Sequence, residues 1–148
     1  MPRDGAPTRE RILDAASKLV VERGFTATTV DAVLDASGTT KGAFFHHFDS
    51  KAALGHALVE RYAAGDLDML EDFMARAEAA SDDPAEQLAA FLRLFEEAAA
   101  EVAHEESGCL YVSFVQQSQL VDESTIDVIV GAVLAWRNRL VAKLEEAA

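Results

Sequence analysis

The fold is decided by one stretch of sequence, Ser37-Gly38-Thr39-Thr40-Lys41-Gly42-Ala43-Phe44-Phe45-His46-His47-Phe48-Asp49-Ser50-Lys51. Its fifteen positions hold two helix-start signals, a glycine turn, two lysines, two histidines and three phenylalanines. This mixture suits a short helix that packs one side against a core and presents the other side to an anionic partner.

A short helix should precede this stretch. Thr28 or Thr29 is expected to cap it, because a threonine hydroxyl accepts a hydrogen bond from the unpaired N–H groups at a helix start. The helix would end at Gly38 and turn three side chains inward, namely Val30, Val33 and Leu34.

A second short helix is expected from Lys41 to about His47, with Thr40 as its cap. Ser50 is placed to cap the helix that follows. Two short helices joined by a turn of three or four residues that contains glycine form the helix-turn-helix pattern.

A longer helix should come first in the chain. Thr8 can cap it, and Gly24 can end it in a left-handed conformation. Between them lies an apolar stripe at the helical period, made of Ile12, Leu13, Ala16, Leu19 and Val20.

The rest of the chain is also expected to be helical. A long helix should run from Lys51 towards Ala80, with Gly65 as a point where it bends or breaks. Asp83 and Pro84 should start a fifth helix, since proline is favoured in a first helical turn. A sixth, from Leu110 to about Leu120, keeps helical spacing although its β-branched residues also suit a strand. A last helix should begin near Asp122 to Ser124 and reach Glu145, which makes an all-α fold of about seven helices.

Charge is distributed unevenly along the chain. The net charge is -13, but residues 1–61 hold eight basic and eight acidic residues, which leaves five of the 13 basic and eighteen of the 26 acidic residues to the remainder. A neutral head on an acidic body is compatible with a nucleic-acid partner if the head gathers its cations on one face. The single cysteine excludes an intrachain disulfide, and the lack of a long apolar run predicts a cytoplasmic protein with no membrane partner.

The amino-terminal part resembles the DNA-binding domain of the TetR family of transcriptional regulators, over roughly fifty residues in order and spacing. The resemblance rests on these segments: the helix from Thr8 to Gly24 with its Ala15-Ala16 pair, Gly24-Phe25, Thr28-Thr29-Val30, Ser37 to Gly42, and Phe45-His46-His47-Phe48 with Lys51 and Leu54. Gly108-Cys109-Leu110 is similar to a motif of some subgroups of that family.

The resemblance implies a three-helix helix-turn-helix DNA-binding domain at residues 1–50 and a helical ligand-binding and dimerisation body at residues 51–148. Family members usually have nine helices, of which the last two pair with those of a second subunit. The chain would lack these two helices, so it is either a truncated form of a homodimer or dimerises through other surfaces.

The residues expected at the DNA are Thr28, Thr39, Thr40, Lys41, Gly42, Phe45, His46, His47 and Lys51. Short polar side chains at the start of the second short helix would reach base edges or phosphates, and Lys51 would bind phosphate as a point charge. Phe45 stands where the family usually has a tyrosine, so the hydroxyl that would bond a phosphate is absent.

Two groups that contain histidine are candidate metal sites. His46 and His47 are adjacent and do not converge on one ion, and His104 with Glu105, Glu106 and Cys109 fits a solvated acidic helix end better. We therefore expect no metal and no cofactor. No nucleophile–base pair or phosphate-binding loop is present in the sequence, so an enzyme is not expected.

The body contains aromatic residues that either fill a core or line a cavity for a small apolar ligand, and periodicity does not separate the two. The resemblance implies an inducer pocket in this region. Its candidate lining residues are Phe91, Phe95, Tyr111, Phe114, Gln117 and Trp136.

The resulting functional hypothesis is a DNA-binding transcriptional regulator, a repressor that a small-molecule inducer releases from a double-stranded operator. The alternative is a helical protein-interaction module that has lost operator binding, suggested by the acidic body and by Phe45.

Overall fold

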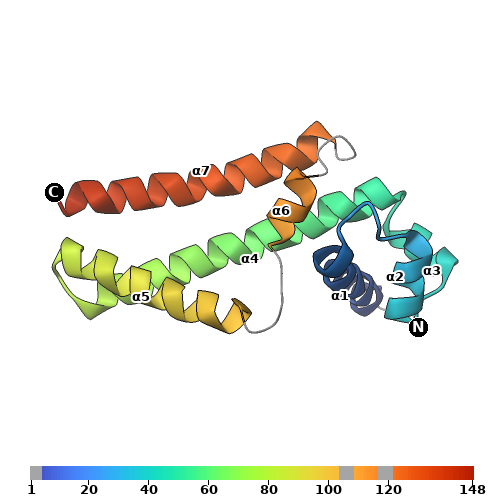
Figure 1. The fold of residues 1–148 in the computed structure, drawn as a ribbon, viewed down its shortest axis with the longest axis horizontal. Helices are drawn as coiled ribbons and strands as arrows, with labels where there is room; N and C mark the ends of the chain where they lie inside the picture. The colour runs from blue at the N-terminus through green and yellow to red at the C-terminus, as the bar shows by residue number, and fades with distance from the viewer. Residues whose placement is uncertain (1–4, 104–108, 117–121) are drawn as a thin grey trace. The chain divides into compact units, whose positions relative to one another are not determined.

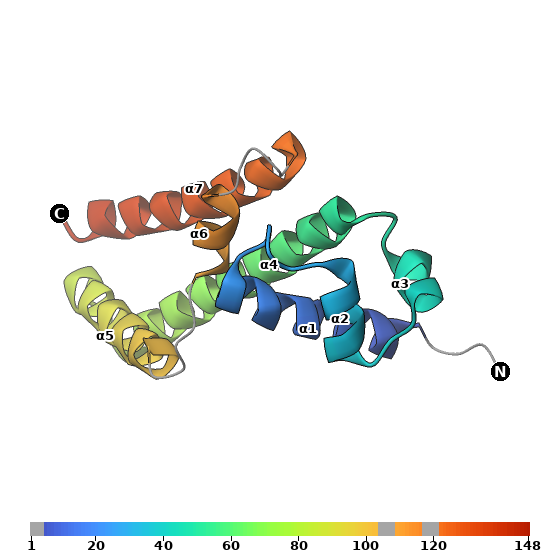
Figure 2. The same cartoon turned by 45° about the vertical axis from the view of Figure 1, so that its right-hand side comes forward.

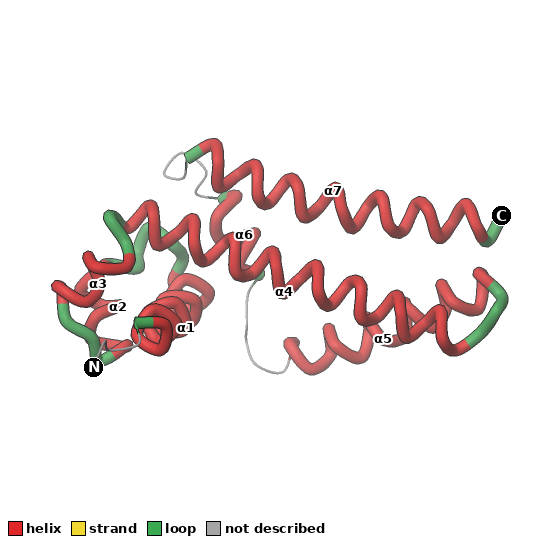
Figure 3. The backbone as a smooth tube through the Cα atoms, turned by 180° about the vertical axis from the view of Figure 1, so that it is seen from behind, coloured by secondary structure: helices red, strands yellow, loops and turns green. Residues whose placement is uncertain are grey.

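The computed structural model describes residues 5–103, 109–116 and 122–148 (Figure 1). The prediction of an all-α fold is confirmed, since every regular element in these ranges is a helix (Figure 3). The helices are α1 (Ala6–Arg23), α2 (Val30–Ser37), α3 (Lys41–His47), α4 (Lys51–Ala80), α5 (Pro84–Ala103), α6 (Leu110–Val115) and α7 (Glu123–Glu146). None of the described helices is long and apolar enough to cross a membrane.

Two predicted helix ends were wrong. α1 begins at Ala6 and not after Thr8, because Pro7 fits the first turn, where its missing N–H is not needed. The described part of the sixth helix ends at Val115, with Gln116 in a turn, and residues 117–121 lie outside the described ranges.

The long helix α4 runs through Gly65, so the break considered at that residue does not occur. Alanines and leucines around Gly65 are good helix formers, and they offset the roughly 1 kcal/mol that one interior glycine costs.

The chain forms two compact units: Met1–Tyr62 with Gly108–Val128, and Ala63–Ser107 with Ile129–Ala148. The first unit therefore holds more than the expected domain of residues 1–50, because it also takes the first part of α4, α6 and the start of α7.

The first unit is built around α1, which packs against α2, α3 and α6 (Figure 2). The five apolar residues of its predicted stripe are all buried. Phe25 follows the turn after α1, and its ring lies 4.7 Å from that of Phe114 on α6. A Cβ added at Gly55 of α4 would lie only 2.7 Å from the Phe25 ring, so α4 approaches this pair closely because position 55 has no side chain.

The second unit has its own core, formed by Leu70, Met74 and Ala77 of α4 and by Phe91 of α5. Trp136 of α7 packs against this core, and its indole N–H donates to the Asp66 carboxylate at 2.9 Å.

A buried lysine ties the three helices of the second unit together. Lys143 Nζ donates to Gln87 Oε1 and to Glu78 Oε1, each at 2.8 Å, and to Glu146 Oε2 at 2.6 Å. These carboxylates raise the pKa of Lys143, while its hydrogen bond, followed by that of Arg139, lowers the pKa of Glu78. The ammonium is thus compensated, as a buried charge requires.

Candidate nucleic-acid interface

The turn between α2 and α3 is set by local hydrogen bonds. Thr29, and not Thr28, caps α2 by accepting from the Ala32 N–H at 3.1 Å. Gly38 ends α2 in the left-handed region, with φ at 62°, where glycine has no steric penalty. Thr40 then caps α3 by accepting from the Ala43 N–H at 3.2 Å, as predicted.

The α3 helix has one apolar side and one exposed side. Phe44 and Phe48 are buried, with 0% and 3% of their surfaces exposed. The exposed side is formed by Lys41, Gly42, Phe45 and His46. Four of the nine residues predicted at the DNA thus share one exposed surface.

The predicted residues next to this surface are partly engaged. Thr39 is half-buried, and its hydroxyl is 2.7 Å from that of Ser37. Thr40 is exposed, although its hydroxyl already accepts the capping bond. His47 is half-buried beside Gly5 and lines a shallow groove with Arg9. These side chains flank the exposed face and do not project from its centre.

Thr28 is not presented to a partner. Only 2% of its surface is exposed, and its hydroxyl donates to the Gly24 carbonyl at 2.9 Å. The residue closes the turn between α1 and α2, so the prediction that it contacts DNA disagrees with its burial.

Lys51 is half-buried, and its ammonium has partners within the first unit. Its ammonium donates to the Thr26 carbonyl at 3.1 Å and lies 4.7 Å from the centre of the Phe25 ring. Burial lowers the pKa of Lys51. One of its three donors is therefore occupied, and the charge joins the start of α4 to the turn after α1.

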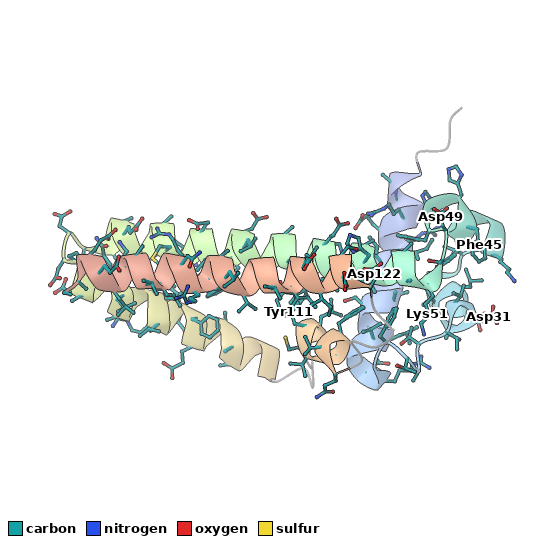
Figure 4. All side chains as sticks on the ribbon, turned by 90° about the horizontal axis from the view of Figure 1, so that it is seen from above. Asp31, Phe45, Asp49, Lys51, Tyr111 and Asp122 are labelled. Carbon is teal, nitrogen blue, oxygen red and sulfur yellow. The ribbon has the colours of Figure 1, made fainter. Side chains whose placement is uncertain are left out.

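Phe45 is exposed on α3 (Figure 4). Its ring packs edge-on against Phe44, with the centroids 5.1 Å apart and the planes at 80°. The exposed side chain therefore has a defined position.

The sequence did not reveal one contact in the first unit. His56 Nδ1 lies 2.9 Å from the Thr125 hydroxyl, which joins α4 to the start of α7. Asp122 caps that start, and bonds from the Thr125 hydroxyl, the Ser124 hydroxyl and the Thr125 N–H lower the pKa of Asp122. The two partners are 69 positions apart, so no local signal could have indicated the contact.

The residues predicted for a ligand pocket divide between the two units. Phe91 and Phe95 meet Trp136 in the second unit, with ring centroids 6.1 and 5.7 Å from the indole. In the first unit, Tyr111 packs on Tyr62, and Phe114 is buried against Phe25 as a core residue. Gln117 lies outside the described residues.

The described ranges hold no group of three or more histidine, cysteine or acidic residues arranged for a metal ion. The candidate metal ligands His104, Glu105 and Glu106 lie outside those ranges.

The amino-terminal helices thus form a helix-turn-helix whose second short helix presents exposed basic, aromatic and histidine side chains. A family model described as "Bacterial regulatory proteins, tetR family" matches residues 12–58. The match begins within α1 and ends in the first third of α4. This match identifies the amino-terminal helices as a TetR-family helix-turn-helix, as the resemblance predicted.

Individual relatives agree with this assignment. The transcriptional regulator AcuR of Cereibacter sphaeroides is 26% identical over 144 residues, which cover 97% of this chain and 64% of that protein. The HTH-type transcriptional repressor KstR2 of Rhodococcus jostii is 44% identical over 62 residues, which cover 42% of this chain and 28% of that protein. The chain thus matches less than two thirds of the length of these relatives.

A solved structure shows the same fold. The regulatory protein TetR from Rhodobacter sphaeroides superimposes with a TM-score of 0.77 at 26% identity, over 93% of this chain and 71% of that one.

Proposed function

We propose that the chain is a DNA-binding transcriptional repressor of the cytoplasm, released from its double-stranded operator by a small-molecule inducer. The observation that carries the proposal is the exposed face of α3, where Lys41, Phe45 and His46 project from a helix anchored by buried Phe44. A helix of this kind, preceded by a glycine turn and a capping threonine, has the form that enters a major groove.

The proposed operator contacts are those predicted residues that the structure leaves accessible. Lys41 and His46 are exposed, Thr39 and His47 lie at the edge of the face, and Thr40 and Gly42 lie at its start. Apart from its own helix backbone and its chain neighbours, a Cβ placed on Gly42 would have no described atom within 4 Å, so the space there is open for a base pair or sugar. Thr28 is left out of the proposed interface.

One helix-turn-helix covers one half-site, and two half-sites a helical turn apart are the usual basis of specificity. We therefore propose a homodimer as the operator-binding form.

Binding to a pool of random-sequence DNA duplexes tests the proposal. The chain should enrich one motif over successive rounds, and Lys41→Met should weaken binding to the enriched duplex about tenfold at 100 mM salt, as expected for loss of a charged contact. A pool that stays random would contradict operator recognition and favour the alternative, a helical interaction module.

The inducer part of the proposal is supported by the aromatic group of the second unit, where Phe95 is 43% exposed beside Trp136. An exposed aromatic next to a core is a suitable wall for an apolar ligand. Trp136 is the single tryptophan of the sequence, so its fluorescence reports on this region alone.

Titration with a panel of small apolar and aromatic compounds should quench or shift the Trp136 emission for one class of compound. The same compound should release the enriched duplex, because linkage requires a ligand that weakens DNA binding to bind the free protein more tightly. A compound that shifts the emission and leaves DNA binding unchanged would contradict the inducer role.

A further inference from the structure

Phe45 differs from the other two phenylalanines of residues 37–51, because its side chain is exposed to solvent. It is 45% exposed, whereas Phe44 and Phe48 are 0% and 3% exposed. Leaving much of a phenyl ring in water forgoes part of the free energy that its full burial would yield. An exposed ring on a helix proposed to enter DNA therefore gains free energy when a partner covers it.

The ring is also held in place before any partner arrives. Its edge-on contact with Phe44 at 5.1 Å joins it to a buried residue. A side chain that is already positioned loses little conformational entropy on binding.

The surroundings of Phe45 are polar or empty. Lys41 is exposed one helical turn earlier on the same side, and the next residue, His46, is exposed as well. Open space surrounds the Cβ position of Gly42. The phenyl ring is thus a single apolar element within a surface suited to hydrogen bonds and phosphate.

A phenyl ring neither donates nor accepts an ordinary hydrogen bond. The base edges of the major groove carry donors and acceptors, and thymine adds one apolar group, its C5-methyl. A phosphate offers the ring no hydrogen bond, since the side chain lacks a hydroxyl.

We propose that Phe45 is a specificity-determining residue that selects thymine in each half-site by packing its ring on the C5-methyl. This inference rests on the proposed function, because it needs α3 in the major groove of an operator. Lys41 and His46 then supply the polar contacts on either side of the thymine.

The test uses the duplex that wild-type protein enriches from the random pool. Each thymine is replaced in turn by deoxyuridine, which removes the methyl and keeps base pairing. One thymine per half-site should be sensitive, with binding weakened about three- to fivefold per methyl, the value expected for one apolar carbon buried.

Variants assign this sensitivity to Phe45. In Phe45→Ala the replacement of thymine by deoxyuridine should weaken binding by less than about 1.5-fold. Enrichment from the random pool by this variant should no longer favour thymine at that position. Phe45→Leu is the matched control, because it keeps an apolar side chain and should keep the deoxyuridine effect. Thermal unfolding of each variant measures any change in folding.

The outcomes separate the two levels of the proposal. Enrichment of a motif with no deoxyuridine-sensitive thymine, or with the same sensitivity in Phe45→Ala, overturns the role of Phe45 and leaves operator binding intact. A wild-type pool that never enriches a motif overturns the proposed function and this inference together.

Discussion

Lys41 and Lys51 have the same charge and stand ten positions apart, but their surroundings differ. Lys41 is exposed at the first position of α3, whereas the Lys51 ammonium is bonded to the Thr26 carbonyl and lies over the Phe25 ring. Both were predicted to contact DNA, and Lys51 to bind phosphate as a point charge. The structure gives Lys51 an internal partner that the sequence did not indicate.

We expect the two lysines to separate in a salt titration. Lys41→Met should lower the slope of log K against log salt for the enriched duplex by about one unit, since one phosphate contact is lost. Lys51→Met should lower the slope by less and should reduce the free energy of unfolding by about 1 kcal/mol, through loss of the hydrogen bond and the cation–π contact. If Lys51→Met lowered the salt slope as much as Lys41→Met and left the free energy of unfolding unchanged, the Lys51 ammonium would contribute to DNA binding and not to folding.

Two glycines of α4 allow a comparison within one helix. An alanine Cβ at Gly55 would lie 2.7 and 2.8 Å from ring carbons of Phe25 and 3.2 Å from the Phe114 ring. At Gly65 the same atom would have no described atom within 4 Å apart from its own helix backbone and its chain neighbours. Both sites gain helix propensity from alanine, so their difference isolates the close approach of α4 to the two rings.

Gly65→Ala should raise the free energy of unfolding by about 0.5–1 kcal/mol, the usual gain for alanine over glycine inside a helix. Gly55→Ala should lower it by about 1–3 kcal/mol, because two buried rings must move and this cost exceeds the propensity gain. Urea denaturation followed by circular dichroism measures both changes. Stabilisation by both variants would mean that Phe25 and Phe114 move aside freely.

The elements that the sequence predicted correctly depend on short-range contacts. Thr40 and Ser50 each accept a hydrogen bond from an N–H three residues ahead, so the cap and its partner lie within one window of sequence. Gly38 likewise ends α2 through its own backbone conformation.

The contacts that escaped prediction join residues far apart in the chain. Lys51 bonds to a carbonyl 25 positions away, and His56 to a hydroxyl 69 positions away. Thr28 is different, because its hydroxyl bonds to the carbonyl of Gly24 only four positions earlier, and helical periodicity does not apply in that turn. Helical periodicity gives the buried face of an element but not the element that it meets, which is why the exposed face of α3 was only partly predictable.

At the scale of the whole molecule, salt that screens the protein's charges should affect folding and DNA binding in opposite directions. The net charge is -13, and eighteen of the 26 acidic residues follow position 61. Their mutual repulsion destabilises the folded chain and is screened by salt, with a Debye length of about 10 Å at 0.1 M. Ion pairs are screened too, but Lys143, with 3% of its side chain exposed, is shielded from that loss.

Raising sodium chloride from 50 to 500 mM should therefore raise the midpoint of thermal unfolding by a few degrees and weaken binding to the enriched duplex by at least tenfold. Replacing the exposed acids Asp68 and Glu97 by Asn and Gln is the matched control. It should raise the midpoint at 50 mM salt and flatten its rise, because fewer charges remain to be screened. A midpoint that falls with salt would show that surface ion pairs such as Arg61 with Asp14, at 2.8 Å, outweigh the repulsion of the acidic residues.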